Sequence, residues 1–395
     1  MPKQIETSPS LPETAGARGG AACRELAAAV LVGVLALAAL DVTFRLAAER
    51  TALPSRIVDI QSAPILDYKL GYLRRHRGRK IVLIGDSLIY GHSLADHGDP
   101  DWRRHGLSAQ LQERLRQGLP PNAHPLVMNL GMDGSVPGDM EYVVRAAADS
   151  GAELVLFDAN IRSFSADFST PKGELTRPWL RTIARPPDAA SATTSTAAIA
   201  WSGRFERSLA RCATRAWNLY AARDFLQNLV LDGAPKKYLA QARKRLNARL
   251  LGQAPVAAAA SAAPAAPAGD AWGDDLILLM KAKSRFKTID FGPQNLQRQA
   301  LERTLRLLAQ RRGKAILFYA YEDRVRLRSI IADERYSRLR ADLEAVAAPY
   351  IGPTLLFLPG AQTIPHERYL DHVHVDREGY RLLLDYLWPK IEKML

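Results

Sequence analysis

The chain has 395 residues, of which 47% are hydrophobic and 24% are charged, and it carries a formal net charge of +13. This composition is close to the globular average, so it excludes a chain that is disordered throughout. The length allows one large domain with an insertion, or two ordinary domains. The two cysteines, Cys23 and Cys212, lie too far apart in kind and position to form a disulfide framework.

The first predicted element is an apolar segment near the N-terminus. Residues 26–40 form an uncharged run that extends to residue 44 if Asp41 lies at a membrane interface. Its length falls between that of a signal-peptide core and that of a membrane-spanning helix, but the leader before it is too long and too mixed in charge for a typical cleaved signal. We therefore predict a flexible tail over 1–24, a transmembrane signal anchor over 25–47 and a membrane-proximal stem over 48–79. The alternative is a buried helix of a soluble domain.

Five short apolar runs rich in Val, Ile, Leu and Phe are predicted to be parallel strands buried on both faces. They cover residues 80–85, 125–130, 153–157, 314–319 and 354–358. Helical patterns over residues 107–117, 138–150, 293–312 and 336–348 alternate with them. This alternation predicts an α/β fold, a three-layer doubly wound parallel sheet of five strands. The loops after the strands then share one edge of the sheet, where ligands bind.

A long insertion separates the third and fourth predicted strands, and it exceeds any ordinary crossover. We predict a helical, basic lid or subdomain over 166–295, with an Ala/Pro-rich linker over 253–269. Residues 204–249 include eleven Lys or Arg and three acids. A basic stripe at helical spacing is either a solvated helix face or a contact for anionic lipid or an anionic polymer; it consists of Arg204, Arg207, Arg211 and Arg215. No nucleic-acid-binding motif is present, so we expect no nucleic-acid partner.

A candidate catalytic set lies at opposite ends of the chain. Gly85-Asp86-Ser87 follows the first predicted strand, and Asp371 and His374 lie just before the C-terminal helix. A serine hydroxyl becomes a good nucleophile only when a base removes its proton, and a third group must hold that base in the right tautomer. We predict Ser87 as nucleophile, His374 as base and Asp371 as the orienting carboxylate.

Acyl transfer also needs donors for the oxyanion of the tetrahedral intermediate. Gly134 follows the second predicted strand and Asn160 follows the third. A backbone N–H at a glycine, an amide side chain and the backbone N–H of Ser87 can supply these donors. We therefore predict an oxyanion hole formed by Ser87, Gly134 and Asn160.

These four fragments resemble the blocks of the SGNH (GDSL) hydrolase family. Its serine block matches Ser87, its glycine block Gly134, its Gly-x-Asn-Asp block Asp158-Ala159-Asn160-Ile161, and its Asp-x-x-His block Asp371 and His374. The resemblance covers 80–165 and 296–395, which we take as the two parts of the hydrolase domain. It implies the flavodoxin-like SGNH fold, an acyl-enzyme on Ser87, and neither a cofactor nor a metal.

The third block departs from the family pattern. Asp158 replaces the usual glycine and Ile161 replaces the usual aspartate, while Asn160 is kept. If Asp158 pointed into the site as a carboxylate, it would oppose a developing oxyanion.

A competing interpretation uses His372-Val373-His374-Val375-Asp376, which resembles the His-x-His-x-Asp opening of metallo-β-lactamase-type hydrolases. Arg377 follows where another ligand would be needed, so too few ligands remain for zinc. His92 and His97 lie near Ser87 in sequence, and we interpret them as solvated surface residues.

The resemblance implies attack of Ser87 on an ester. Membrane-anchored relatives in alginate acetylation and lipoteichoic acid D-alanylation systems look like acyl-transfer partners of membrane-bound O-acyltransferases. We therefore predict a single-pass inner-membrane serine esterase or O-acyltransferase that faces the periplasm or cell exterior. Its substrate would be an envelope glycan or glycolipid, and a membrane-bound O-acyltransferase is its candidate partner. The alternatives are a lysophospholipase or thioesterase-like lipid hydrolase, and a non-catalytic scaffold of an acylation complex.

Overall fold

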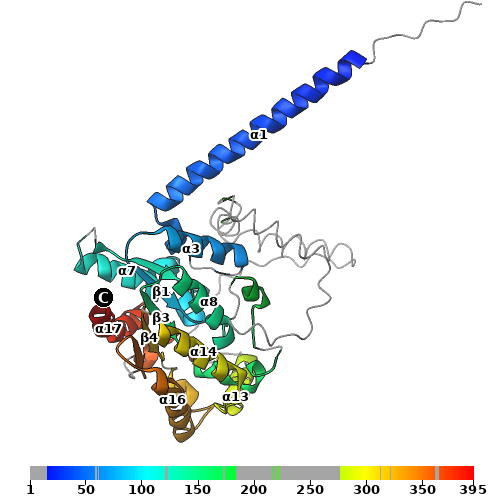
Figure 1. Cartoon of the computed structure of the whole chain (residues 1–395). Coiled ribbons are helices and arrows are strands. Elements are labelled where there is room, and N and C mark those ends of the chain that lie inside the picture. The colour runs from blue at the N-terminus through cyan, green and yellow to red at the C-terminus, as the bar shows by residue number, and fades with distance from the viewer. Residues whose placement is uncertain are drawn as a thin grey trace, which may run out of the picture.

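A five-stranded parallel sheet with the strand order β2-β1-β3-β4-β5 forms the centre of the computed structural model (Figure 1). Its strands are β1 (Lys80–Ile84), β2 (Leu126–Asn129), β3 (Leu154–Asp158), β4 (Lys314–Phe318) and β5 (Leu355–Leu358). This is the order of flavodoxin-like doubly wound sheets. The predicted fold class is therefore confirmed. The structure describes residues 16–57, 60, 62–120, 123–171, 174–183, 217, 219, 222, 276–311, 313–320, 322–360 and 364–395.

One face of the sheet is covered by four helices. Val82, Ile84, Val155 and Phe157 of the strands belong to the same buried cluster as the apolar sides of these helices. The helices are α3 (Ala63–Arg75), α8 (Pro137–Asp149), α14 (Leu296–Gln310) and α16 (Asp333–Ala347). Their apolar residues recur at helical spacing, so each helix can bury one side and expose the other.

The opposite face is covered mainly by two helices, α7 (Leu107–Gly118) and α17 (Arg377–Met394). Leu83 and Leu156 of the sheet share this second cluster with Leu111 of α7 and Leu387 of α17. The structure thus has the predicted three layers. Shorter helical segments connect the elements: α2 (Leu53–Arg56), α4 (Ser87–Tyr90), α5 (Ser93–Asp96), α6 (Trp102–His105), η2 (Ile161–Phe164), η3 (Ala166–Phe168), η4 (Pro178–Thr182), α13 (Leu276–Lys287), α15 (Arg324–Leu327), η5 (Ala348–Tyr350) and η6 (His366–Arg368).

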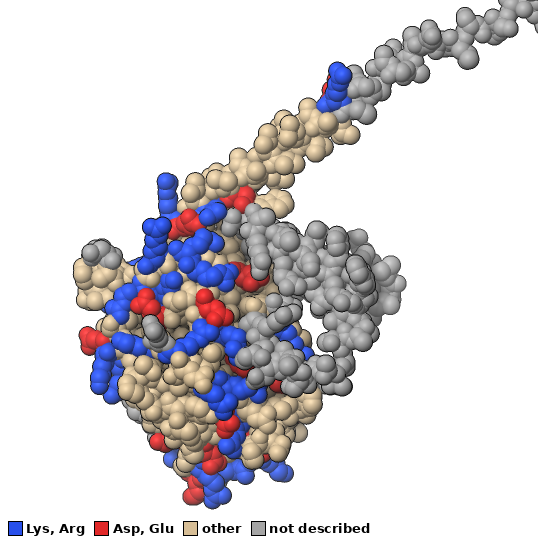
Figure 2. Space-filling model, viewed as in Figure 1, with Lys and Arg blue, Asp and Glu red and all other residues tan. Residues whose placement is uncertain are grey.

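The N-terminal helix α1 (Gly16–Arg50) projects away from the sheet domain (Figure 1). Its segment Arg24–Arg50 is long and apolar enough to cross a membrane. The apolar side chains of this segment are exposed on several sides, as at Leu26 and Val32. Figure 2 shows that the surface of α1 is uncharged over most of its length, while Lys and Arg gather on the domain next to the foot of the helix. A helix that is apolar all round is typical of a membrane span or a buried core, and this one is not buried in the domain.

The segment predicted as a membrane-proximal stem packs on the domain. Ile57, Leu66 and Leu70 are fully buried in the first cluster. Lys69 is also buried, and its Nζ donates hydrogen bonds to the carbonyl oxygens of Ile57 and Asn129. The stem is thereby joined to the carboxyl end of β2.

The predicted insertion is described only in part. Its beginning includes η3 and η4, and its end includes α13. The basic stripe from Arg204 to Arg215 and the linker over 253–269 lie outside the described residues.

Candidate active site

Ser87 lies directly beyond the carboxyl end of β1, as the first residue of α4. Gly85 makes this tight turn possible, because a Cβ atom there would lie 2.4 Å from Ile89 Cγ1 and 2.8 Å from Asp158 Cβ. Asp86 caps the short helix, since its Oδ1 accepts a hydrogen bond of 2.9 Å from Leu88 N. The strand, the glycine and the cap together fix the position of Ser87.

His374 connects Ser87 with Asp371. Its Nε2 lies 2.7 Å from Ser87 Oγ, and its Nδ1 lies 2.6 Å from Asp371 Oδ2. Because an ionised carboxylate can only accept, Nδ1 carries the proton, and Nε2 is left to accept the serine hydroxyl. The structure therefore brings the three predicted triad residues together in the order that general-base activation of a serine requires.

The carboxylate of Asp371 is held in its ionised form. Burial raises its pKa, but hydrogen bonds from the His374 side chain and from the backbone N–H groups of His374 and Val373 outweigh burial and bring the pKa below its ordinary value. The two backbone hydrogen bonds, both to Oδ1, are 2.8 Å long. Asp371 can therefore stabilise a protonated His374 during the reaction.

Asn160 lies on the same side of the sheet, at the start of η2 beyond β3. Its Nδ2 donates to Asp86 Oδ2 over 2.5 Å, and Asn160, Asp86 and Ser87 line one narrow cleft. An amide nitrogen carries two hydrogens. Asn160 can therefore bind Asp86 and still donate to an oxyanion.

Gly134 lies in a loop that is tied to the turn before Ser87. Met132 N and Ser135 Oγ both donate to Gly85 O, over 3.0 and 2.8 Å. Gly134 has a φ angle of +60°, which favours glycine. Among the described residues no hydrogen bond joins Gly134 to Ser87 or Asn160, and Gly134 lines a neighbouring hollow instead.

Asp158 is the last residue of β3 and is fully buried. Burial, together with the negative charge of Asp86, raises its pKa well above the ordinary value, although the backbone N–H of Ala320 opposes this. The carboxyl group is therefore neutral near pH 7. A neutral Asp158 does not oppose an oxyanion, so the substitution in the third block leaves the electrostatics of the site compatible with acyl transfer.

Arg162 is a site residue that the sequence analysis missed. Its backbone N and its Nε donate to Asn160 Oδ1 over 2.8 and 3.1 Å, and its Nη2 lies 3.5 Å from Asp86 Oδ2. Its Nη1 lies 3.4 Å from His372 Nε2. Burial and the charge of Arg162 lower the pKa of His372 to about 3, so His372 is neutral. The only signal in the sequence is an arginine two residues after the asparagine of the third block.

A second missed residue holds the loop that carries the histidine. Arg326 Nη1 donates to the carbonyl oxygens of Tyr369 and Asp371 over 3.0 and 2.7 Å. The neighbouring Asp323 N–H donates to His372 O over 2.9 Å. Helix α15 thus anchors the loop between β5 and α17 against the end of β4.

The histidines near Ser87 in sequence take no part in these contacts. His92 Nδ1 lies 3.2 Å from Asp96 Oδ2, and its ring stacks on Tyr90. His97 is exposed, and its Nδ1 lies 2.8 Å from Ser93 O. Neither ring has a hydrogen bond to the triad.

The histidine-rich alternative also finds no support in the geometry. His374 belongs to the triad, and Asp376 caps α17 by accepting from Gly379 N over 2.7 Å. Within the part of the chain that the structure describes, no group of three or more His, Cys, Asp or Glu side chains could hold a metal ion.

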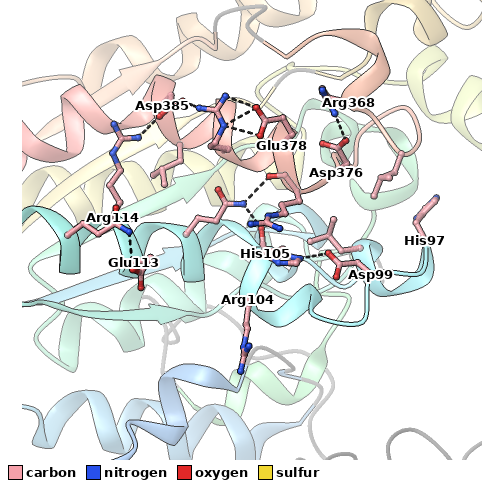
Figure 3. A pocket seen from close by; sticks show the side chains of 17 residues that line it. His97, Asp99, Arg104, His105, Glu113, Arg114, Arg368, Asp376, Glu378 and Asp385 are labelled. Carbon is pink, nitrogen blue, oxygen red and sulfur yellow. Dashed lines mark hydrogen bonds and ion pairs between the residues drawn. The ribbon is translucent and has the colours of Figure 1, made fainter.

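The largest hollow lies elsewhere, between α7 and the beginning of α17 (Figure 3). It has a volume of about 1090 Å³, and no triad residue lines it. Its charged side chains pair with one another, as His105 does with Asp99 over 2.6 Å and Arg368 with Asp376 over 3.4 Å. Because its charges are largely compensated, this hollow offers no clear site for a charged ligand.

No protein-family model matches the chain, and no curated protein matches it. Two solved structures are similar. The crystal structure of TesA is 14% identical with a TM-score of 0.34, over 80% of this chain and 100% of that chain. A carbohydrate acetylesterase family member from Sinorhizobium meliloti is 12% identical with a TM-score of 0.35, over 80% of this chain and 99% of that chain.

At these scores the two similarities carry no argument about activity. The strand order and the placement of the four blocks at successive strand ends are independent of them. The chain has an SGNH-like α/β fold. What it does must be argued from the contacts of Ser87 and its neighbours.

Proposed function

We propose that this protein is a membrane-anchored serine esterase or O-acyltransferase of the SGNH type. The observation that carries the proposal is the continuous hydrogen-bond chain from Ser87 through His374 to Asp371. Such a chain is needed to activate a serine hydroxyl and has no evident structural purpose at the mouth of a sheet. It also argues against a non-catalytic scaffold.

In the first half-reaction, Ser87 Oγ attacks the carbonyl carbon of the ester while His374 Nε2 takes the hydroxyl proton. The Ser87 N–H and the Asn160 amide, joined by the N–H of Gly134 if its loop closes on the substrate, bind the oxyanion. Collapse of the tetrahedral intermediate breaks the bond to the alcohol oxygen, which receives the proton from His374. The product is an acyl-enzyme on Ser87 and a free alcohol.

In the second half-reaction, His374 removes a proton from water or from an acceptor hydroxyl. The resulting nucleophile attacks the acyl-enzyme, and Ser87 regains its proton when the intermediate collapses. Water gives hydrolysis and an acceptor hydroxyl gives transfer. The same triad serves both, so acceptor binding decides between them.

The surroundings of Ser87 favour a short acyl group. The cleft beside it is narrow and lined mostly by polar side chains, including Asp86, Asn160, Arg162 and Glu322. A long acyl chain would need an extended apolar channel. This supports an ester such as an acetyl group on a glycan or glycolipid over a lysophospholipid or a long-chain thioester.

Helix α1 supports the proposal that the protein is anchored in the inner membrane by a single span, with its hydrolase domain at the periplasmic or outer side. A periplasmic reporter fused after Arg50 tests this orientation. Activity of the reporter in the periplasm is the expected result, and activity only in the cytoplasm would remove an extracellular glycan as substrate.

The catalytic proposal is tested with the full-length protein in detergent and p-nitrophenyl acetate as substrate. We expect turnover by the wild type and its loss in Ser87→Ala. Absence of turnover in the wild type, or equal turnover in the variant, would contradict an enzymatic role. Product analysis in the presence of a glycan acceptor then separates transfer from hydrolysis.

A further inference from the structure

A separate hollow opens over the Gly134 loop. It has a volume of about 320 Å³ and is lined by Asp133, Gly134, Thr176, Arg177 and Trp179. A Cβ atom built on Gly134 would meet no atom within 4 Å, so the space above this glycine is open. The hollow therefore lies against the loop that is hydrogen-bonded to the turn before the nucleophile.

One wall of the hollow comes from the beginning of the insertion, and it is firmly attached to α8. Asp139 is fully buried, and its Oδ1 accepts from Arg177 N over 3.0 Å while its Oδ2 accepts from Thr176 Oγ1. Asp139 Oδ2 also accepts from Val136 N over 3.3 Å. One carboxylate thus connects the insertion with the loop that carries Gly134.

Two further contacts tighten this junction. The Arg177 guanidinium donates to the carbonyl oxygen of Asp133. At Gly138, a Cβ atom would lie 2.0 Å from Glu174 O, so only glycine admits the chain at this distance. The hollow is therefore a preformed feature with fixed walls, which lowers the cost of binding a ligand there.

The lining combines one aromatic ring with groups that form hydrogen bonds. Trp179 is half-buried and packs on the first cluster, while Asp133 is exposed at the rim. The carboxylate of Asp133 accepts, the guanidinium of Arg177 donates, and the Thr176 hydroxyl can do both. A sugar ring needs this combination, because it has an apolar C–H face and a rim of hydroxyl groups. The volume equals that of about ten liquid waters, which is enough for one such ring.

We propose that this hollow is the subsite for the sugar ring whose hydroxyl carries the acyl ester attacked by Ser87. The inference rests on the proposed function and deepens it, because it assigns the alcohol part of the ester to a carbohydrate and not to a lipid. The Gly134 loop then joins two tasks: its backbone faces the reacting carbonyl, and its outer side supports the sugar.

The test compares two substrates on the full-length protein in detergent, p-nitrophenyl acetate and glucose pentaacetate. The measured quantity is the ratio of kcat/KM for the sugar ester to kcat/KM for p-nitrophenyl acetate. We expect this ratio to fall about tenfold in Trp179→Ala, because a stacked aromatic contributes up to about that factor. A smaller fall in the same direction is expected for Asp133→Ala, which removes an exposed carboxylate without opening the core.

Trp388→Ala is the matched control, since Trp388 is also a half-buried tryptophan but lies on α17 under the Arg114 guanidinium. Its ratio should equal that of the wild type. If Trp179→Ala fails to fold, Asp133→Ala carries the test alone. An unchanged ratio in the folded variants would overturn the sugar subsite while leaving the esterase intact, whereas absence of turnover of both esters by the wild type would instead contradict the proposed function.

Discussion

His374 Nε2 lies 2.7 Å from Ser87 Oγ, although 287 positions separate the two residues in the chain. Ser87 follows β1 at the centre of the sheet, and His374 follows β5 at its edge. The loop before α17 crosses this distance because Arg326 and the backbone of Asp323 hold it over the end of β4. The site therefore depends on contacts between both parts of the hydrolase domain.

We expect Ser87→Ala and His374→Ala each to lower kcat for p-nitrophenyl acetate by about 10⁴-fold or more, because the two groups act as one unit. For the same reason the double variant should be no slower than either single variant. Ser329→Ala, at an exposed serine of the same domain, is the control and should keep wild-type kcat. Additive losses would show that the two side chains do not act on the same step.

Asp371→Asn should lower kcat by about 10²–10⁴-fold, because an amide cannot hold His374 in the required tautomer. It should also change the dependence of stability on pH. The pKa of Asp371 is lower in the folded protein than in the unfolded chain, so its contribution to stability is present above about pH 4 and is lost as the pH falls. In urea unfolding from pH 6 to pH 3, the variant should lose less stability than the wild type. Parallel curves would contradict the ionised, hydrogen-bonded carboxylate.

Asp158→Asn should have the opposite effect on stability. The pKa of Asp158 is raised in the folded protein, so above about pH 4 the unfolded chain ionises while the folded protein keeps its proton. Stability from this group therefore falls as the pH rises. We expect the variant to be more stable than the wild type at pH 8, with a smaller difference at pH 4, and to keep esterase activity within several-fold.

Asp149→Asn is the control for that experiment, because Asp149 is an exposed partner of Arg311. It should show no comparable gain at pH 8. A strong loss of activity in Asp158→Asn at unchanged stability would indicate that Asp158 has a catalytic role that its burial does not suggest.

Arg162→Gln tests whether Arg162 positions Asn160. The arginine donates to Asn160 Oδ1 from two nitrogens, which directs the amide nitrogen toward Asp86 and the site. We expect kcat to fall about 10–100-fold with little change in KM, because an oxyanion donor acts mainly in the transition state. Arg162→Lys should not restore the rate, since lysine lacks the planar fork.

A double-mutant cycle separates this positioning role from a general loss of stability. If Arg162 acts through Asn160, the combination of Arg162→Gln with Asn160→Ala should be no slower than Asn160→Ala alone. Additive effects would show that Arg162 acts independently of Asn160.

The sheet and the triad could be predicted because their signals are local. Each predicted strand is a short apolar run, and Ser87, Gly134 and Asn160 each follow one of them directly. The offset between Asp371 and His374 is likewise short enough for the two side chains to meet within one turn of the chain. Helix boundaries moved by a few residues: α16 begins at Asp333 and not at residue 336, since acidic residues in a first turn favour the helix.

The remaining features depend on contacts between distant segments. Arg162 and Arg326 act through long side chains whose direction no sequence pattern reveals. The protonation of Asp158 depends on complete burial beside Asp86, and burial of a strand's last residue cannot be read from its type. The attachment of Thr176 and Arg177 to Asp139 joins the insertion to α8, which sequence spacing does not indicate.

The most direct test of the account is to trap the acyl-enzyme. Full-length protein is mixed with p-nitrophenyl acetate, quenched in acid within the first turnovers and digested, and the peptides are measured by mass spectrometry. We predict one acetyl group on the peptide that contains Ser87, and none on that peptide in Ser87→Ala. Turnover without an adduct on Ser87, or with an acetyl group on another residue that accounts for turnover, would contradict Ser87 as the nucleophile.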